Sequence, residues 1–94
     1  MHLAAVLVNN FTNAMYTAAD GLLSDKLDFK LLLPLIQRTT AKLDTMSPAR
    51  AQTGPAKRGD KNVMKKHLLQ LKTQPELQKI YKEMSRLIKK QQHD

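Results

Sequence analysis

Apolar residues recur at a helical spacing in the first quarter of the chain, between residues 2 and 23. When these residues are projected at 100° each, one side is apolar and a narrow stripe on the other side is polar. The apolar side consists of Ala4, Leu7, Val8, Phe11, Met15, Ala18 and Leu22. The polar stripe consists of His2, Asn9, Asn13, Tyr16 and Asp20, with Val6 as its only apolar member. The pattern predicts an amphipathic helix that ends near Gly21.

A second helix is predicted from Asp28 to about Thr45. The Asp28 carboxylate is suited to cap the first backbone N–H groups. Residues 31–36 show no polar face, which is typical of a helix that is buried on all sides. Pro34 lies too deep in this segment to be the first helical residue, so we expect it to bend the helix. Because a chain of 94 residues has difficulty surrounding such a segment, the pattern favours a homodimer.

Residues 46–59 are rich in residues that interrupt helices, and Gly54-Pro55 and Gly59 indicate turns. We expect one longer ordered loop here, after which Asp60 caps a third helix over about 61–72. The residues of this helix that are expected to face inward are Val63, Met64, His67, Leu68 and Leu71.

A fourth helix is predicted over about 75–91. Thr73 and Glu76 have the spacing of a capping box, in which each side chain accepts from a backbone N–H group at the start of the helix. The apolar stripe of this helix consists of Leu77, Ile80, Tyr81, Met84, Leu87 and Ile88. No segment alternates with the period of a strand, so the predicted fold is all-α, with about four helices in a dimeric bundle.

The composition is that of a globular protein without disulfides. Hydrophobic residues make up 41% of the chain, and cysteine and tryptophan are absent. The most apolar stretch is interrupted by Asn9, Asn10, Asn13 and Asp20, whereas a membrane-spanning helix needs about 20 almost uninterrupted apolar residues. The start of the chain also lacks the basic residues of a signal peptide. We therefore expect a cytoplasmic protein that does not enter the membrane.

The net charge of +8 arises entirely from the second half of the chain. Residues 1–46 carry four basic and four acidic side chains, whereas residues 47–94 carry twelve basic and four acidic ones. Such an imbalance indicates an anionic partner or a solvated lysine-rich surface. A small basic helical nucleic-acid-binding protein is the alternative function. We favour it less, because acidic residues are interspersed and no aromatic platform for bases is present.

Motifs for independent catalysis are absent. The chain has no Gly-x-Gly-x-x-Gly or Walker loop to hold a nucleotide phosphate. The three histidines, His2, His67 and His93, lack the spacing of metal ligands, and there is no cysteine nucleophile. We therefore expect this chain by itself to bind neither a metal nor NAD nor NADP, and to be inactive alone.

Two segments carry a family resemblance. The start of the chain, His2 to Asn13, and the run Thr53-Gly-Pro-Ala-Lys-Arg-Gly-Asp60 resemble the C-terminal helical domain of Rossmann-like NAD(P)-dependent oxidoreductases, a domain of unknown function. That group is similar to 6-phosphogluconate dehydrogenase, β-hydroxyacid dehydrogenases and pyrroline-5-carboxylate reductase. The resemblance implies a helical domain that dimerises and closes a substrate site. It also implies a longer parent protein, in which an N-terminal domain absent from residues 1–94 binds NAD or NADP.

The resemblance also suggests catalytic candidates. In β-hydroxyacid dehydrogenases, the comparable helix carries a lysine followed four residues later by an asparagine. Asn10 matches that asparagine, but Val6 occupies the lysine position. A β-hydroxyacid reaction is therefore disfavoured, and the resemblance leaves hydride transfer to a small polar substrate with another acid, for which His2 is the candidate.

Four further residues are candidates for substrate binding. Asn9 and Asn13 either belong to a solvated face or line a substrate cleft. The residue pattern by itself favours the solvated face, since surface helices normally have a polar side, although asparagine forms helices poorly. The resemblance shifts the preference to the cleft. Thr53 and Arg58 either bind an anionic group, to which a guanidinium makes two parallel hydrogen bonds, or belong to a tight connection in which Arg58 pairs with Asp60. The sequence leaves the choice for Thr53 and Arg58 open.

Overall fold

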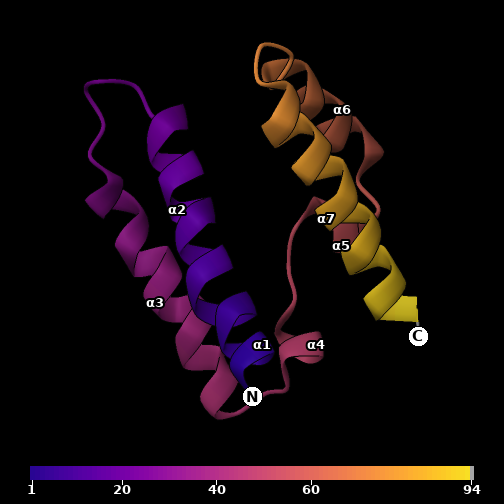
Figure 1. Ribbon diagram of the computed structural model, residues 1–94. Coiled ribbons are helices and arrows are strands. Elements are labelled where there is room, and N and C mark those ends of the chain that lie inside the picture. Colours follow the sequence, from indigo (N-terminus) through magenta and orange to yellow (C-terminus); the bar gives the residue numbers. More distant parts are fainter. Residues whose placement is uncertain (94) are drawn as a thin grey trace. The chain divides into compact units, whose positions relative to one another are not determined.

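In the computed structural model, all regular secondary structure of the described residues 1–93 is helical, and these residues contain no strand (Figure 1). This confirms the predicted all-α class. The chain divides into two compact units, an N-terminal unit of residues Met1–Arg38 and a C-terminal unit of residues Thr39–Asp94. Each unit is described by itself below.

The N-terminal unit begins with the predicted helix, which is helical from residue 2 to residue 22. Three consecutive elements form it: α1 (His2–Ala5), the π-helical turn η1 (Val6–Asn10) and α2 (Phe11–Leu22). The chain becomes extended at Leu23, which ends the helix close to the predicted position. The π-helical turn was not predicted.

The second predicted helix consists of three pieces. They are the 3-10 turn η2 (Phe29–Leu32), α3 (Leu33–Ala41) and the 3-10 turn η3 (Lys42–Asp44). Asp28 caps the first piece as predicted, because its Oδ1 accepts from the backbone N–H of Lys30 at 2.8 Å. Pro34 is the second residue of α3 rather than an interior residue. The change from the 3-10 turn to the α-helix thus falls beside Pro34, and the bend expected at this residue stays a prediction.

The packing face of α2 also differs from the prediction. The Tyr16 ring is half-buried and meets the Phe29 ring edge to face, with centroids 6.0 Å apart. Phe11, on the apolar side of the predicted helix, is 58% exposed. The residues around Pro34 are not enclosed either, since Leu31 is 65% exposed. Within this unit, the most apolar surfaces of both helical segments therefore remain accessible.

The C-terminal unit contains two short helices where a loop was expected. They are α4 (Pro48–Ala51) and α5 (Pro55–Arg58), and each begins with a proline. Proline suits the first helical position because its φ angle is already helical and its missing N–H would have no helical partner. The Ser47 Oγ completes the start of α4 by accepting from the backbone N–H of Arg50 at 3.3 Å. The prediction of an unbroken loop over residues 46–59 is thus wrong.

The remaining two helices, α6 (Lys61–Gln70) and α7 (Pro75–His93), form a hairpin (Figure 1). Asp60 caps α6 as predicted. The helix α7 starts one residue later than the capping box requires, so Gln74 rather than Thr73 precedes its first residue. Gln78 of α7 donates from Nε2 to the carbonyl oxygen of Leu68 in α6 at 2.8 Å. The short helix α5 packs against both α6 and α7.

The core is very small. Leu71, between α6 and α7, is the only residue among 1–93 that is buried, with 6% of its surface exposed. Four of the residues predicted to face inward on α6 are half-buried, namely Val63, Met64, His67 and Leu68. The interior predicted for α6 is therefore confirmed, but it is a contact layer between helices rather than an enclosed core.

Candidate functional site

The π-helical turn η1 contains two of the candidate residues, Asn9 and Asn10. The backbone N–H of Phe11 donates to the carbonyl oxygen of Val6, five residues back, and the Thr12 hydroxyl donates to the carbonyl oxygen of Leu7 at 3.3 Å. Such a turn holds one residue more than an α-helical turn and is frequent at functional sites. The candidate asparagines thus occupy the least regular part of the first helix.

The extra residue changes which side chains share a face. An inserted residue rotates the helix before it by about 100° relative to a regular α-helix. The polar stripe predicted by regular projection is therefore not continuous between His2 and Asn13. His2, Asn9, Asn10 and Asn13 are all exposed, whereas Tyr16 leaves the stripe and packs on Phe29.

The segment from Gly54 to Asp60 is explained largely by backbone geometry. Gly54 (φ 107°) and Gly59 (φ 70°) both have positive φ angles, which L-residues with a side chain rarely adopt. The backbone N–H of Asp60 donates to the carbonyl oxygen of Pro55 at 2.9 Å, across the left-handed Gly59, which closes α5 with a Schellman motif. The Asp60 Oδ1 then accepts from the backbone N–H of Val63 at 3.2 Å and opens α6.

The backbone geometry of this segment does not explain why residues 53 and 58 are threonine and arginine. Both side chains are exposed. Arg58 forms no ion pair with Asp60 in the described structure. The Asp60 carboxylate instead accepts from the backbone N–H of Val63 at the start of α6. The alternative in which Arg58 pairs with Asp60 is therefore wrong, and the guanidinium is available to an external group.

A polar pair that was not predicted links α6 to α7. The Tyr81 hydroxyl lies 2.7 Å from Nδ1 of His67, and the two rings meet edge to face with centroids 5.7 Å apart. Burial raises the pKa of the Tyr81 phenol above its usual value of 10.0. The phenol is therefore protonated at neutral pH, and it donates to Nδ1 of His67 or accepts from it according to the tautomer of the imidazole. Both residues lie on the apolar stripes predicted for their helices, and this shared position is the feature of the sequence that could have indicated their contact.

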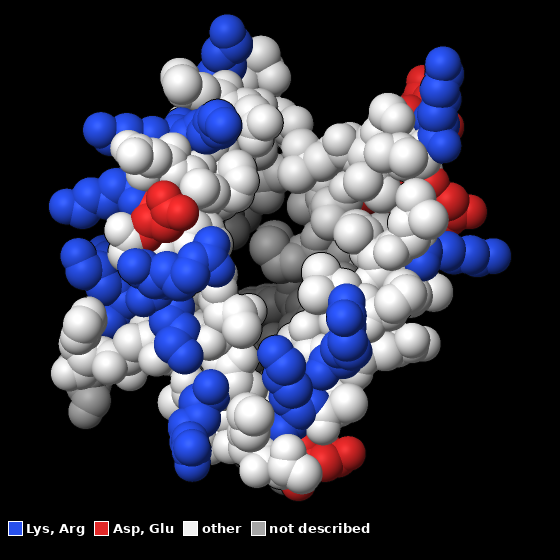
Figure 2. All heavy atoms as spheres, turned by 180° about the vertical axis from the view of Figure 1, so that it is seen from behind, with Lys and Arg blue, Asp and Glu red and all other residues white. Residues whose placement is uncertain are grey.

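The C-terminal unit carries the positive charge expected from the sequence. Lys and Arg side chains outnumber Asp and Glu side chains in the space-filling view (Figure 2). One carboxylate of α7, that of Glu83, is engaged by Arg86 on the same helix at 3.2 Å. The lysines of α6 and α7 are exposed and solvated.

The described residues 1–93 contain neither a candidate metal site nor a candidate membrane-spanning helix. No group of three or more His, Cys, Asp or Glu side chains lies close enough in this part of the chain to hold a metal ion. Within the same residues, no helix combines the length and apolar character that crossing a membrane requires.

The fold and the candidate residues define an all-helical domain made of helix pairs, with a polar π-helical turn and an exposed arginine after a glycine-proline turn. The chain belongs to the family described as "Domain of unknown function (DUF2520)", which matches residues 1–88. This confirms the predicted relationship to a helical domain of unknown function. None of the curated proteins compared with the chain matches it.

A solved structure is also similar. It is that of a Bacteroides fragilis protein described as a "putative NADP oxidoreductase", with 47% sequence identity and a TM-score of 0.91. The similarity covers 95% of this chain but only 35% of the other, so the chain spans about a third of the length of that protein.

Proposed function

We propose that this chain is the dimerisation and substrate-site domain of an NADP-dependent oxidoreductase. The observation that carries the proposal is the similarity of 95% of the chain, at 47% identity, to one third of a protein described as an NADP oxidoreductase. The other two thirds of that protein supply ample length for a dinucleotide-binding domain, for which residues 1–94 contain no phosphate-binding loop. In this proposal, NADP binds to that other domain of the same polypeptide.

The exposure of large apolar side chains supports the dimerisation role. Leu71 is the only buried residue among residues 1–93, so apolar surface that a core would cover is accessible to a partner.

Apolar side chains of the N-terminal unit make up much of this surface. Both helical segments of the unit contribute large exposed side chains, which are Leu3, Leu7, Val8, Phe11, Met15, Leu22, Leu27, Leu31, Leu33 and Leu35. Exposed apolar patches on this scale mark interaction sites. A second copy of the chain, related by a twofold axis, is the simplest partner for such a surface.

The substrate role is assigned to the residues that remain exposed and polar. Asn9 and Asn13 orient a small polar substrate through their amides, and Asn10 and His2 are the candidates for catalysis. His2 is the candidate proton donor because Val6 stands where related dehydrogenases carry lysine. In the C-terminal unit, Thr53 and Arg58 bind an anionic group of the substrate, such as a carboxylate or phosphate.

The test compares the chain alone with the longer polypeptide that contains it. We expect the reading frame before Met1 to encode about 130 residues or more with a Gly-x-Gly-x-x-Gly turn. Calorimetric titration should show binding of NADPH to the longer polypeptide and none to residues 1–94 alone. Micromolar binding of NADPH to residues 1–94, or an upstream sequence without a dinucleotide-binding motif, would overturn the proposal.

A cytoplasmic location follows from this proposal, since hydride transfer with NADP is chemistry of the reducing cell interior. It remains a prediction, which fractionation of cells that produce the protein would check. The alternative function, nucleic-acid binding, receives no support from the comparison with known proteins.

A further inference from the structure

A groove along α6 and α7 is lined by none of the candidate substrate residues. It consists of two adjoining hollows of about 290 and 320 Å³, which share Lys65 and Leu68. We call it the α6–α7 groove. It extends along α6 from Lys61 to Leu69, a distance of about 12 Å at the rise of a helix, or just over two turns, and it continues to Lys72 in the turn that follows α6. Both hollows are open to solvent rather than enclosed.

The floor of the groove is apolar. Met64 and Leu68 of α6 form it together with the ring of Tyr81 from α7, whose hydroxyl is occupied by His67. Leu69 continues the floor in the second hollow and is 69% exposed. An exposed leucine at the end of an apolar strip provides an anchor point for a partner's apolar side chain.

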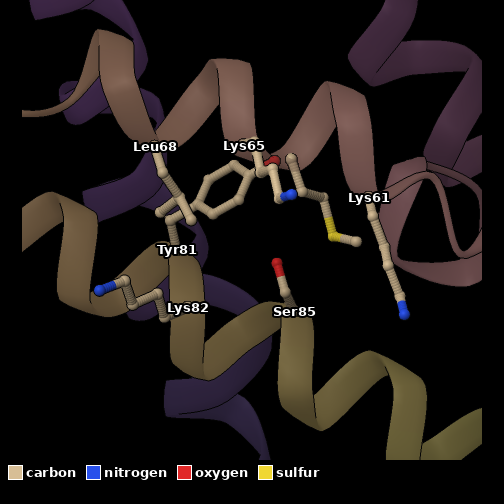
Figure 3. Close-up of a pocket in the computed structure, with 7 residues that line it drawn as sticks. Lys61, Lys65, Leu68, Tyr81, Lys82 and Ser85 are labelled. Atoms are coloured by element: carbon tan, nitrogen blue, oxygen red, sulfur yellow. The ribbon is translucent and has the colours of Figure 1, made fainter.

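The rim of the groove is basic. Four lysines line it, Lys61, Lys65, Lys72 and Lys82, and no acidic residue does. Figure 3 shows Lys61 and Lys82 on opposite sides of the Tyr81 ring. The nearby carboxylates are engaged elsewhere, that of Asp60 by the start of α6 and that of Glu83 by Arg86. The groove thus attracts anionic groups along its length.

We propose that the α6–α7 groove binds an acidic amphipathic helix from outside this chain. An apolar strip with lysines on both sides matches a helix that carries leucine-type residues on one face and carboxylates beside them. The open shape does not enclose a small molecule. A nucleic acid would leave the apolar floor without a partner, and the half-buried Tyr81 ring is poorly placed to stack on bases.

A second copy of the chain fits this groove poorly. The helical segment of residues 2–22 contains a single acidic residue, Asp20. Helix α7 contains two, Glu76 and Glu83, of which Glu83 is already paired with Arg86. The partner helix therefore belongs to another sequence, and this inference does not depend on the proposed oxidoreductase role.

The test uses the intact protein and a fluorescein-labelled synthetic helix of about 14 residues, with leucines at positions i, i+3, i+4 and i+7 and flanking glutamates. Fluorescence anisotropy measures its affinity. We expect the peptide to bind about tenfold more tightly than a version with glutamine in place of glutamate. A version with the leucines moved off the stripe should not bind.

Variants of the protein then locate the binding. Lys65→Glu, in the stretch shared by both hollows, should weaken binding at least about fivefold, and so should Lys82→Glu on the other wall. Lys89→Glu makes the same charge change on α7 outside the groove and should stay within about twofold of the unaltered protein. All three lysines are exposed, so circular dichroism should confirm unchanged folding.

Three results would overturn the proposal. If Lys65→Glu and Lys89→Glu weakened peptide binding equally, the binding would reflect general charge attraction. If the peptide with displaced leucines bound as tightly as the original one, the apolar floor would have no role in binding. Tighter binding of phosphatidylserine vesicles or duplex DNA than of the peptide, abolished by Lys65→Glu, would assign the groove to a membrane surface or a nucleic acid instead.

Discussion

At the scale of single residues, the hydrogen bond between Tyr81 and His67 joins the side chains of α6 and α7, beside the bond from Gln78 to the carbonyl oxygen of Leu68. The phenol has a raised pKa because the folded state disfavours the charged phenolate. A group whose pKa is raised on folding contributes stability below its unfolded value, and this contribution is lost as the pH rises further. The stability contributed by Tyr81 is therefore present at neutral pH and declines above about pH 10.

We expect Tyr81→Phe to lower the stability at pH 7 by about 1 kcal/mol, because His67 loses its half-buried partner. The same variant should lose less stability than the unaltered protein between about pH 9.5 and 11, because it has no phenol to ionise at this position. Urea unfolding followed by circular dichroism at several pH values measures both effects. Tyr16→Phe is the matched control for removing a hydroxyl, and identical alkaline slopes for the unaltered protein and Tyr81→Phe would refute the assignment.

Arg58 gives a second prediction at this scale, for the longer oxidoreductase that we propose. The guanidinium is exposed and unpaired with Asp60, so Arg58→Ala removes no internal contact that the structure records. We expect KM to rise by about tenfold or more, since a charge-assisted hydrogen bond to a ligand contributes about 1.5–3 kcal/mol. The melting temperature should stay within about 2 °C.

Steady-state kinetics and thermal unfolding of the same preparation check this prediction. Arg58→Lys is the informative companion, because it keeps the charge but loses the planar fork and should recover only part of the affinity. A lowered melting temperature with an unchanged KM would make Arg58 a structural residue.

At the scale of elements, the junction between α5 and α6 depends on one glycine. Gly59 has φ 70°, and a Cβ there would meet no atom within 4 Å, so only the backbone conformation opposes a side chain. We expect Gly59→Ala to destabilise the C-terminal unit by about 1 kcal/mol. The left-handed conformation costs alanine about 1–2 kcal/mol, and part of this is offset because alanine lowers the conformational entropy of the unfolded chain.

Gly21→Ala is the matched control for this substitution. Gly21 lies in α2 with an ordinary helical φ angle and has equal space around it, so alanine there should raise stability by up to about 1 kcal/mol. Chemical denaturation of the two variants compares the signs. If both substitutions changed stability in the same direction, the left-handed Gly59 would not be what closes α5.

The sequence predicted the elements better than their environment. Asp28 and Asp60 mark helix starts because a carboxylate that accepts from a backbone N–H acts locally. The two short helices were missed although Pro48 and Pro55 are first-turn signals, because nearby glycines favoured a loop. The π-helical turn has no comparable local signal, since its register depends on five-residue hydrogen bonds that side-chain periodicity does not specify.

The candidate site illustrates the same limit. Asn9, Asn10 and Asn13 could be selected from the sequence as unusual helix residues, but their shared face could not, because one extra residue in the turn rotates them. The packing face of α2 was predicted to be the apolar one, whereas Tyr16 packs and Phe11 is exposed. Periodicity identifies an apolar face without indicating whether the same chain or another one covers it.

At the scale of the whole molecule, we predict a homodimer that buries the apolar surface of the N-terminal unit, over more than about 2,000 Å² in total. Analytical ultracentrifugation at micromolar concentration should give the dimer mass. Leu31→Asp changes a side chain that is 65% exposed and should weaken the dimer. Leu32→Asp and Ile36→Asp change half-buried side chains and should give unfolded or aggregated protein. A well-folded species of monomer mass from the unaltered chain would contradict the prediction.

The helix-pair construction of each unit has a consequence for how quickly the protein forms. Most of its contacts join residues that are near each other in the chain, and chains of such low contact order fold within microseconds to milliseconds. Little loop-closure entropy has to be overcome before α6 meets α7. Leu71 is, however, the only buried residue among residues 1–93, so the chain that forms rapidly has hardly any enclosed core. If the chain forms the homodimer that we propose, its slow step is then a second-order encounter, and the half-time of this step should shorten in proportion to protein concentration.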